Sequence, residues 1–134
     1  RFVLAHEQRL TDLFADLTLS GASLRSEADL APFMRPRCLP DFVRRYAPES
    51  AWTDPLASPL YGDYRGLPPL LLQVGEHEII RDDSVGVAAR AEAAGVEVTL
   101  EVWEGLFHVF PSHEPLLPEA REAIARVAEH LAHR

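Results

Sequence analysis

The order of apolar and helix-ending residues in the second half of the chain strongly limits the folds open to it. Residues 70–74 (LLLQV) are almost continuously apolar, which is typical of a strand covered on both faces in a parallel sheet, so we expect a central strand there. Asp82 and Asp83 stand where negative charge favours the beginning of a helix, and Gly95 stands where a left-handed residue ends one. These signals predict a helix over residues 82–94.

A second strand is predicted directly after this helix. Val98, Leu100 and Val102 alternate with polar residues, which is the period-two pattern of a half-exposed strand, so we expect residues 97–103 to form the edge of the sheet. The predicted helix is about 20 Å long and the predicted strand about 23 Å. The chain can therefore cross over and return parallel to the first strand, which makes the carboxyl ends of the two strands neighbours.

An acid and a histidine follow these two strand ends. Glu78 comes just after the first strand and His108 just after the second, so a carboxylate and an imidazole could meet there. Such a pair is the orienting and base half of a Ser-His-acid relay, for which the chain order in α/β-hydrolases is nucleophile, acid, histidine. From spacing alone, the alternative stays open that His108 is a buried histidine bonded to a backbone carbonyl. Glu76, Asp82 and Asp83 crowd the same loop, where Glu76 can be interpreted as a solvated side chain.

Four segments carry a resemblance to a known family: PPLLLQVGEHEIIRDD, VEVTLEVWEGLFHVF, DLTLSGAS and DPLASPLY. They resemble the C-terminal portion of the hormone-sensitive-lipase-like α/β-hydrolases, the "α/β-hydrolase fold 3" esterases and lipases, over residues 16–134. The resemblance implies an acid 30 residues before the histidine, which from His108 selects Glu78. Many members have aspartate there, and glutamate can serve chemically in the same role. The resemblance implies that Glu78 accepts a hydrogen bond from His108 Nδ1.

The family's HGGG oxyanion segment and Gly-x-Ser-x-Gly nucleophile elbow do not occur in this sequence, and Ser20 and Ser58 lack the strand-to-helix context of such an elbow. We therefore expect residues 1–134 to be the C-terminal fragment of a single α/β-hydrolase domain with an incomplete sheet. Residues 18–69 would form loops and short helices near the active-site mouth, and residues 70–134 the strand-helix-strand, histidine-loop and helix part. We expect carboxylic ester hydrolysis by the whole enzyme and an inactive fragment.

The resemblance also suggests which side chains could line a substrate pocket, although core packing is the alternative for most of them. They are Phe33, Met34, Phe42, Tyr46 and Phe107. A different class of function, a non-catalytic ligand-binding or interaction module, stays open because the same scaffold occurs in receptor proteins that have lost the histidine. The presence of His108 favours the enzyme.

Weaker signals predict the remaining helices. Apolar residues at helical spacing suggest a helix within residues 1–17, and Ser26 is a plausible cap for a short helix through Leu30. Pro40 begins a short helix with Phe42, Val43 and Tyr46 expected on one buried side. A closing helix beginning at Pro118 should pack across the sheet through its apolar stripe, which is Ala120, Ala123, Ile124, Val127 and Leu131.

Composition restricts the partners. A net charge of −8 and a pI near 5.1 argue against nucleic acid and anionic membranes, which need a basic face, so we expect a small-molecule ester substrate. The histidine spacings match no zinc arrangement, and we expect neither a metal nor a cofactor. No apolar run approaches the roughly 18 residues of a membrane span. Cytoplasm is the default location, and the edge strand at residues 97–103 could pair in a homodimer.

Overall fold

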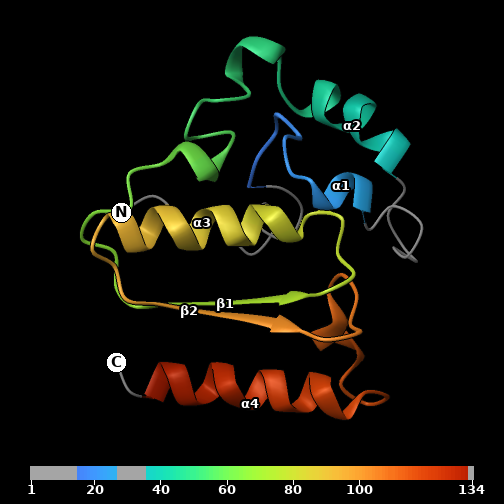
Figure 1. Cartoon of the computed structure of the whole chain (residues 1–134), viewed down its shortest axis with the longest axis vertical. Coiled ribbons are helices and arrows are strands. Elements are labelled where there is room, and N and C mark those ends of the chain that lie inside the picture. The colour runs from blue at the N-terminus through green and yellow to red at the C-terminus, as the bar shows by residue number, and fades with distance from the viewer. Residues whose placement is uncertain (1–14, 27–35, 133–134) are drawn as a thin grey trace.

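The computed structural model describes residues 15–26 and 36–132, and its elements form layers on the two faces of a small sheet (Figure 1). The two strands lie between α3 on one face and α4 on the other, and the segments before β1 lie beyond α3. The helices and strands are α1 (Ser23–Ser26), α2 (Leu39–Tyr46), β1 (Leu70–Gly75), α3 (Arg81–Ala93), β2 (Val98–Trp103) and α4 (Pro118–Ala132). Short 3₁₀ helices cover Pro36–Cys38, Glu49–Ala51, Pro59–Tyr61 and Phe110–His113.

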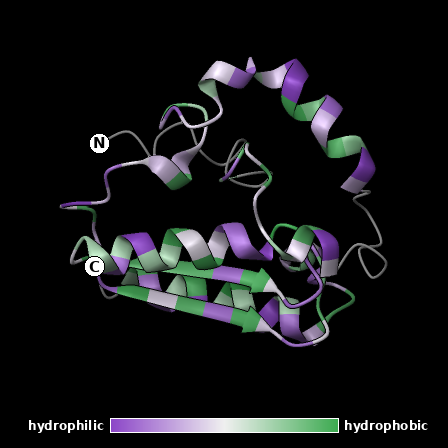
Figure 2. Cartoon of the chain, turned by 45° about the horizontal axis from the view of Figure 1, so that its top comes forward, coloured by the Kyte–Doolittle hydropathy of each residue, from purple (hydrophilic) through white to green (hydrophobic). Residues whose placement is uncertain are grey.

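The predicted strand-helix-strand unit is confirmed. β1 and β2 pair in parallel, with Leu70 opposite Val98 and Gly75 opposite Trp103. The helix between them ends before Gly95, whose φ of +81° is the left-handed conformation expected after a helix. Both strands are drawn largely in the green of hydrophobic residues in Figure 2. The carboxyl ends of β1 and β2 therefore emerge side by side.

The prediction that the first strand is central does not hold for the described residues, in which β1 has β2 as its single neighbour. Leu70, Leu71 and Leu72 are consequently half-buried, whereas Val74 is buried. The backbone groups on the other edge of β1 face no strand within residues 15–26 and 36–132. This is the incomplete sheet that we predicted from the sequence.

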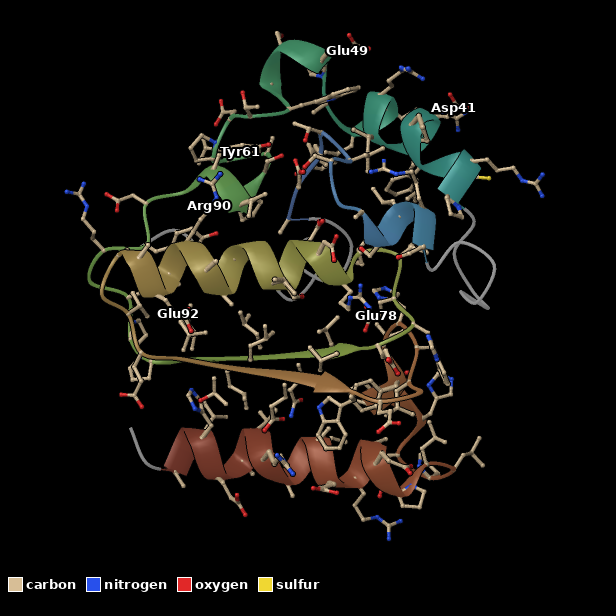
Figure 3. The ribbon with its side chains drawn as sticks, viewed as in Figure 1. Asp41, Glu49, Tyr61, Glu78, Arg90 and Glu92 are labelled. Carbon is tan, nitrogen blue, oxygen red and sulfur yellow. The ribbon has the colours of Figure 1, made fainter. Side chains whose placement is uncertain are left out.

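Small residues on α3 allow the chain before β1 to pack closely on the helix. A Cβ atom at Gly86 would lie 2.9 Å from Leu60 Cδ1, so glycine leaves room for the 3₁₀ turn Pro59–Tyr61. The Arg90 guanidinium lies over the ring of Tyr61 in that turn, 5.3 Å from its centroid, and Figure 3 shows the two side chains together. The helix therefore covers the sheet with one side and receives the upstream loop on the other.

The first turn of α3 also holds the segment at residues 15–26. Asp83 is buried, and its Oδ2 accepts hydrogen bonds from the backbone N–H of Ala15 at 2.8 Å and of Asp16 at 2.9 Å. Ser23 Oγ donates to the carbonyl oxygen of Ile79 at 2.9 Å. The sequence pattern explains the presence of Asp83 only by the favourable effect of negative charge at a helix N-terminus. The structure shows that it also binds a segment far away in the chain.

The predicted helix at Pro40 is present, but its buried side was wrong for two residues. α2 packs through Leu39 and Val43, whereas Phe42 and Tyr46 are 52% and 45% exposed. Leu39 and Val43 are four positions apart and form one stripe of the helix, while Phe42 and Tyr46 form the neighbouring stripe. The core contacts the first of these stripes, and sequence periodicity alone does not distinguish them.

Two other helix predictions changed in detail. α1 is Ser23–Ser26, so Ser26 is its last residue and not a cap. The predicted continuation through Leu30 lies outside the described residues, as does most of the helix predicted within residues 1–17. In α4 the stripe is buried at Ala120 and Ala123, but its second half is exposed, namely Ile124, Val127 and Leu131. Two strands about 5 Å apart are too narrow to cover a helix about 10 Å wide along its whole length.

The burial of Asp83 generates a prediction about pH. Burial raises the pKa of Asp83 to about 6 from 3.8, although the two N–H groups oppose the rise and the Asp16 and Asp82 carboxylates add to it. The folded chain therefore holds this proton more tightly, and the stabilisation that this gives is complete below pH 3.8 and is lost as the pH rises through about 6. The effect amounts to roughly 3 kcal/mol.

Asp83→Asn keeps an oxygen acceptor for both N–H groups and removes the titration. We expect the free energy of unfolding of the variant to rise relative to the parent chain between pH 4 and pH 7, measured by urea denaturation. Asp41→Asn, at an exposed position on α2, is the control and should follow the parent chain. Parallel curves for the parent chain and Asp83→Asn would contradict the raised pKa.

The free edge of β2 generates a second prediction. Val102 is 49% exposed on a strand with one partner among the described residues, and unpaired edge groups are a template for another chain. We expect self-association at tens of micromolar that Val102→Lys reduces, because a charged edge opposes pairing. Light scattering coupled to size exclusion measures this, with Leu56→Lys, in an exposed loop, as the control. Association that is equal in both variants would exclude pairing through β2.

Candidate functional site

Two loops meet at the carboxyl ends of the strands. We call residues 75–80, from the last residue of β1 to the residue before α3, the acid loop, and residues 104–109, after β2, the histidine loop. A Cβ atom on Gly75 would lie 2.5 Å from the carbonyl oxygen of Leu106, so the loops can approach this closely only with glycine there. The N–H of His77 donates to the same carbonyl at 2.9 Å. The backbone alone therefore brings the two loops into contact.

Glu78 and His108 meet in this contact. His108 Nδ1 lies 2.8 Å from Glu78 Oε2, and the Glu78 Oε1 atom accepts the N–H of Gly75 at 2.7 Å. A carboxylate can only accept, so Nδ1 is the donor. Both side chains are largely buried, and Figure 3 shows Glu78 between the end of β1 and the beginning of α3. The contact that the sequence predicted between these two side chains is present.

This arrangement defines what the histidine can do chemically. Because the carboxylate accepts from Nδ1, the neutral ring carries its proton there and has a free electron pair on Nε2. Nε2 has no hydrogen-bond partner within the part of the chain that the structure describes. It can therefore take a proton from a hydroxyl group placed next to it, and the Glu78 carboxylate then stabilises the imidazolium.

The residue after His108 has an unusual backbone. Val109 has a φ of +53°, the left-handed region that β-branched residues rarely adopt. Its carbonyl oxygen accepts from the N–H of Ser112 at 3.0 Å, in the turn that places Phe110. Phe110 is buried and packs against Trp103, with the ring centroids 5.5 Å apart. His108 is thus followed by a residue in a strained backbone conformation and then by a buried aromatic side chain that anchors the loop.

The predicted substrate-lining residues are not gathered in one place. Phe107 lies next to His108, and its ring packs edge-on against His113 at 5.2 Å. Phe42 and Tyr46 lie on the exposed stripe of α2, while the buried stripe of α2 shares its cluster with Ile79 and Ile80 of the acid loop. Phe33 and Met34 lie outside the described residues. Their roles in binding remain predictions.

Sequence reasoning missed one polar contact of the site. Glu76, interpreted as a solvated side chain, accepts the N–H of Gly105 through Oε2 at 2.9 Å. Gly105 has a φ of +69°, and a glycine directly after a strand was the available signal for such a turn. Ser20 and Ser58 have structural partners: Ser20 Oγ donates to Asp16, and Ser58 Oγ donates to the carbonyl of Trp52.

Residues 15–26 and 36–132 contain neither a metal-binding cluster nor a helix that could span a membrane. No group of three or more histidine, cysteine, aspartate or glutamate side chains is arranged to hold a metal ion. None of the helices in these residues has both the length and the apolar character to cross a membrane.

Comparison with known proteins gives a consistent result. Residues 8–112 match a family described as having the alpha/beta hydrolase fold. An acetyl-hydrolase of Streptomyces hygroscopicus is 40% identical over 111 residues, which cover 83% of this chain and 37% of the relative. An esterase of Acinetobacter venetianus is 36% identical over 117 residues, or 87% of this chain and 39% of the relative. The chain thus spans about two-fifths of the length of these curated relatives.

Solved structures agree with the sequence relatives. EstE5 soaked with ethyl alcohol superposes with a TM-score of 0.85 at 37% identity, over 91% of this chain and 41% of EstE5. An esterase from the bacterial hormone-sensitive lipase family gives 0.82 at 41% identity, over 87% of this chain and 39% of that one. The chain belongs to the α/β-hydrolase fold family. Within it, these neighbours confirm the hormone-sensitive-lipase-like resemblance.

The backbone of Val109 generates a prediction about stability. A left-handed conformation costs a residue with a side chain roughly 1–2 kcal/mol. Glycine avoids this cost, but it offsets roughly 0.5–1 kcal/mol of the gain because it loses more backbone entropy on folding. Val109→Gly should therefore leave the free energy of unfolding unchanged or raise it by up to about 1.5 kcal/mol, measured by urea denaturation. The same change in the middle of α3, Val85→Gly, should destabilise. A loss as large at Val109 as at Val85 would contradict the strain.

Proposed function

We propose that this chain contributes the acid and the histidine of a Ser-His-acid triad that hydrolyses carboxylic esters, with Glu78 as the acid and His108 as the base. The observation that carries the proposal is the 2.8 Å contact between His108 Nδ1 and Glu78 Oε2. A carboxylate held by a backbone N–H on its second oxygen is fixed in orientation, and it fixes the ring in turn. Membership of the α/β-hydrolase family supports the same assignment.

The proposed reaction passes through an acyl-serine intermediate. His108 Nε2 takes the proton of a serine hydroxyl, the serine oxygen attacks the ester carbonyl carbon, and the protonated ring then gives its proton to the leaving alcohol. Water repeats the sequence on the acyl-serine and releases the acid. Serine and oxyanion donors would come from sequence other than these 134 residues, because neither motif occurs in them.

The substrate class follows from the relatives and from the site. Relatives carry the names acetyl-hydrolase and esterase, so we propose a small carboxylic ester as the substrate. Among the predicted lining residues this proposal favours Phe107, which directly precedes His108 in the sequence. The alternative function, a non-catalytic binding or interaction module, requires no proton transfer by His108, so mutation of this residue distinguishes the two.

A chimera provides the test. Residues 15–132 replace the matching segment of the Streptomyces hygroscopicus acetyl-hydrolase, whose remaining sequence supplies whatever this chain lacks. We expect the chimera to hydrolyse p-nitrophenyl acetate. We expect His108→Ala and Glu78→Gln each to lower kcat by about 10³-fold or more, because they remove the base and its orienting group. His130→Ala, which removes a histidine from α4, is the matched control and should leave kcat within about threefold.

Three outcomes would contradict the proposal. Activity that survives His108→Ala would show that another group is the base. A folded chimera without activity would favour the non-catalytic module. Finally, the 134-residue chain by itself should turn over the ester no faster than its own His108→Ala variant, so hydrolysis blocked by a serine-directed inhibitor would reveal a nucleophile within it.

A further inference from the structure

The contact between the acid loop and the histidine loop depends on more than Glu78 and His108. Glu76 forms two hydrogen bonds with the segment Trp103–Gly105, where β2 ends and the histidine loop begins. Its backbone N–H donates to the carbonyl oxygen of Trp103 at 2.9 Å, and its side-chain Oε2 accepts the N–H of Gly105 at 2.9 Å. Glu76 therefore binds both the first residue and the third residue of the turn that leads from β2 to His108.

The turn at Trp103–Leu106 fixes the position of the histidine loop. Leu106 N–H donates back to the Trp103 carbonyl oxygen at 3.3 Å, and the left-handed φ of Gly105 aims its N–H at Glu76. Two residues beyond this turn is His108. A rotation of the Gly105 peptide would therefore move the Leu106 carbonyl that lies against Gly75, and with it the His108 ring.

The geometry of the pair tolerates little movement. His108 Nδ1 and Glu78 Oε2 are 2.8 Å apart, and a charge-assisted hydrogen bond of this kind weakens steeply once the groups separate or tilt. The Glu78 side of the contact is fixed by the N–H of Gly75. The His108 side is fixed through its loop, which the Glu76 carboxylate holds.

We propose that Glu76 is a positioning residue of the site: its carboxylate holds the Gly105 peptide and thereby keeps the His108 ring in register with Glu78. The inference rests on the proposed function, because it assigns Glu76 a part in the same proton transfer. Glu76 forms no hydrogen bond with the His108 ring within the described residues. Its part is carried by a hydrogen-bond acceptor in the right place, and its negative charge is incidental.

That distinction sets the choice of variants. Glu76→Gln retains an oxygen that can accept the Gly105 N–H, whereas Glu76→Ala removes it. A role through charge alone would make the two variants equivalent, because both remove the negative charge. A positioning role separates them. Glu104→Ala is the matched control, since Glu104 is an exposed carboxylate of the same loop with no hydrogen bond or ion pair within the described residues.

In the chimera, we expect Glu76→Ala to lower kcat for p-nitrophenyl acetate about three- to tenfold with KM unchanged, because the acceptor is partly exposed and the loss is of orientation. Glu76→Gln and Glu104→Ala should stay within about twofold of the parent chimera, and the pH midpoint of kcat should be the same in Glu76→Gln as in the parent. Equal losses in Glu76→Ala and Glu76→Gln, or no loss in either, would overturn the positioning role while the effect of His108→Ala still stands.

A second readout needs no catalysis. In the 134-residue chain, hydrogen exchange of the Gly105 amide measured by NMR should be faster in Glu76→Ala and unchanged in Glu76→Gln. The ¹⁵N shifts of the His108 ring should show that Nδ1 loses part of its proton occupancy in Glu76→Ala only. Should the chimera be inactive, the proposed function fails and these shifts still decide the inference. Identical exchange and identical ring shifts in all variants would overturn it.

Discussion

The parallel pairing of β1 with β2 is the constraint on which the site depends. It places Gly75 opposite Trp103, so that the next residues of both strands leave the sheet at the same edge. A slip of one residue would turn every side chain of one strand to the other face and separate the two loops. The missing Cβ of Gly75 then lets the Leu106 carbonyl lie against the acid loop. The strand pairing and the close approach at Gly75 together bring Glu78 and His108 into contact.

The elements that the sequence predicted well are those specified by neighbouring residues. Gly95 marks the end of α3 through its own backbone conformation, and the alternation of Val98, Leu100 and Val102 marks β2 through its own period. The meeting of an acid with a histidine also followed, because parallel strands joined by a crossover must end side by side. The resemblance to a family then selected Glu78 from the several acids in its loop.

The features that the sequence did not predict are decided by residues far away in the chain. Whether α2 buries Leu39 or Phe42 depends on the side from which the core approaches, and the two stripes are almost equally apolar. The partners of Asp83 are backbone groups 67 and 68 positions earlier, which no local pattern encodes. Glu76 is similar, because an exposed glutamate and one bound to the Gly105 amide look the same in a sequence.

The first turn of α3 is where three parts of the chain are joined. Asp82 Oδ2 accepts the N–H of Ser23 at 3.0 Å, and Ser23 Oγ in turn receives the N–H of Asp82 and donates to the Ile79 carbonyl. Asp83 holds the beginning of the same upstream segment. These hydrogen bonds join residues 15–26, the acid loop and this turn, so we expect the three to open together in local unfolding. Chimeras of such hydrolases should keep the three segments from the same parent. A recombination point between them would leave buried polar groups without hydrogen-bond partners.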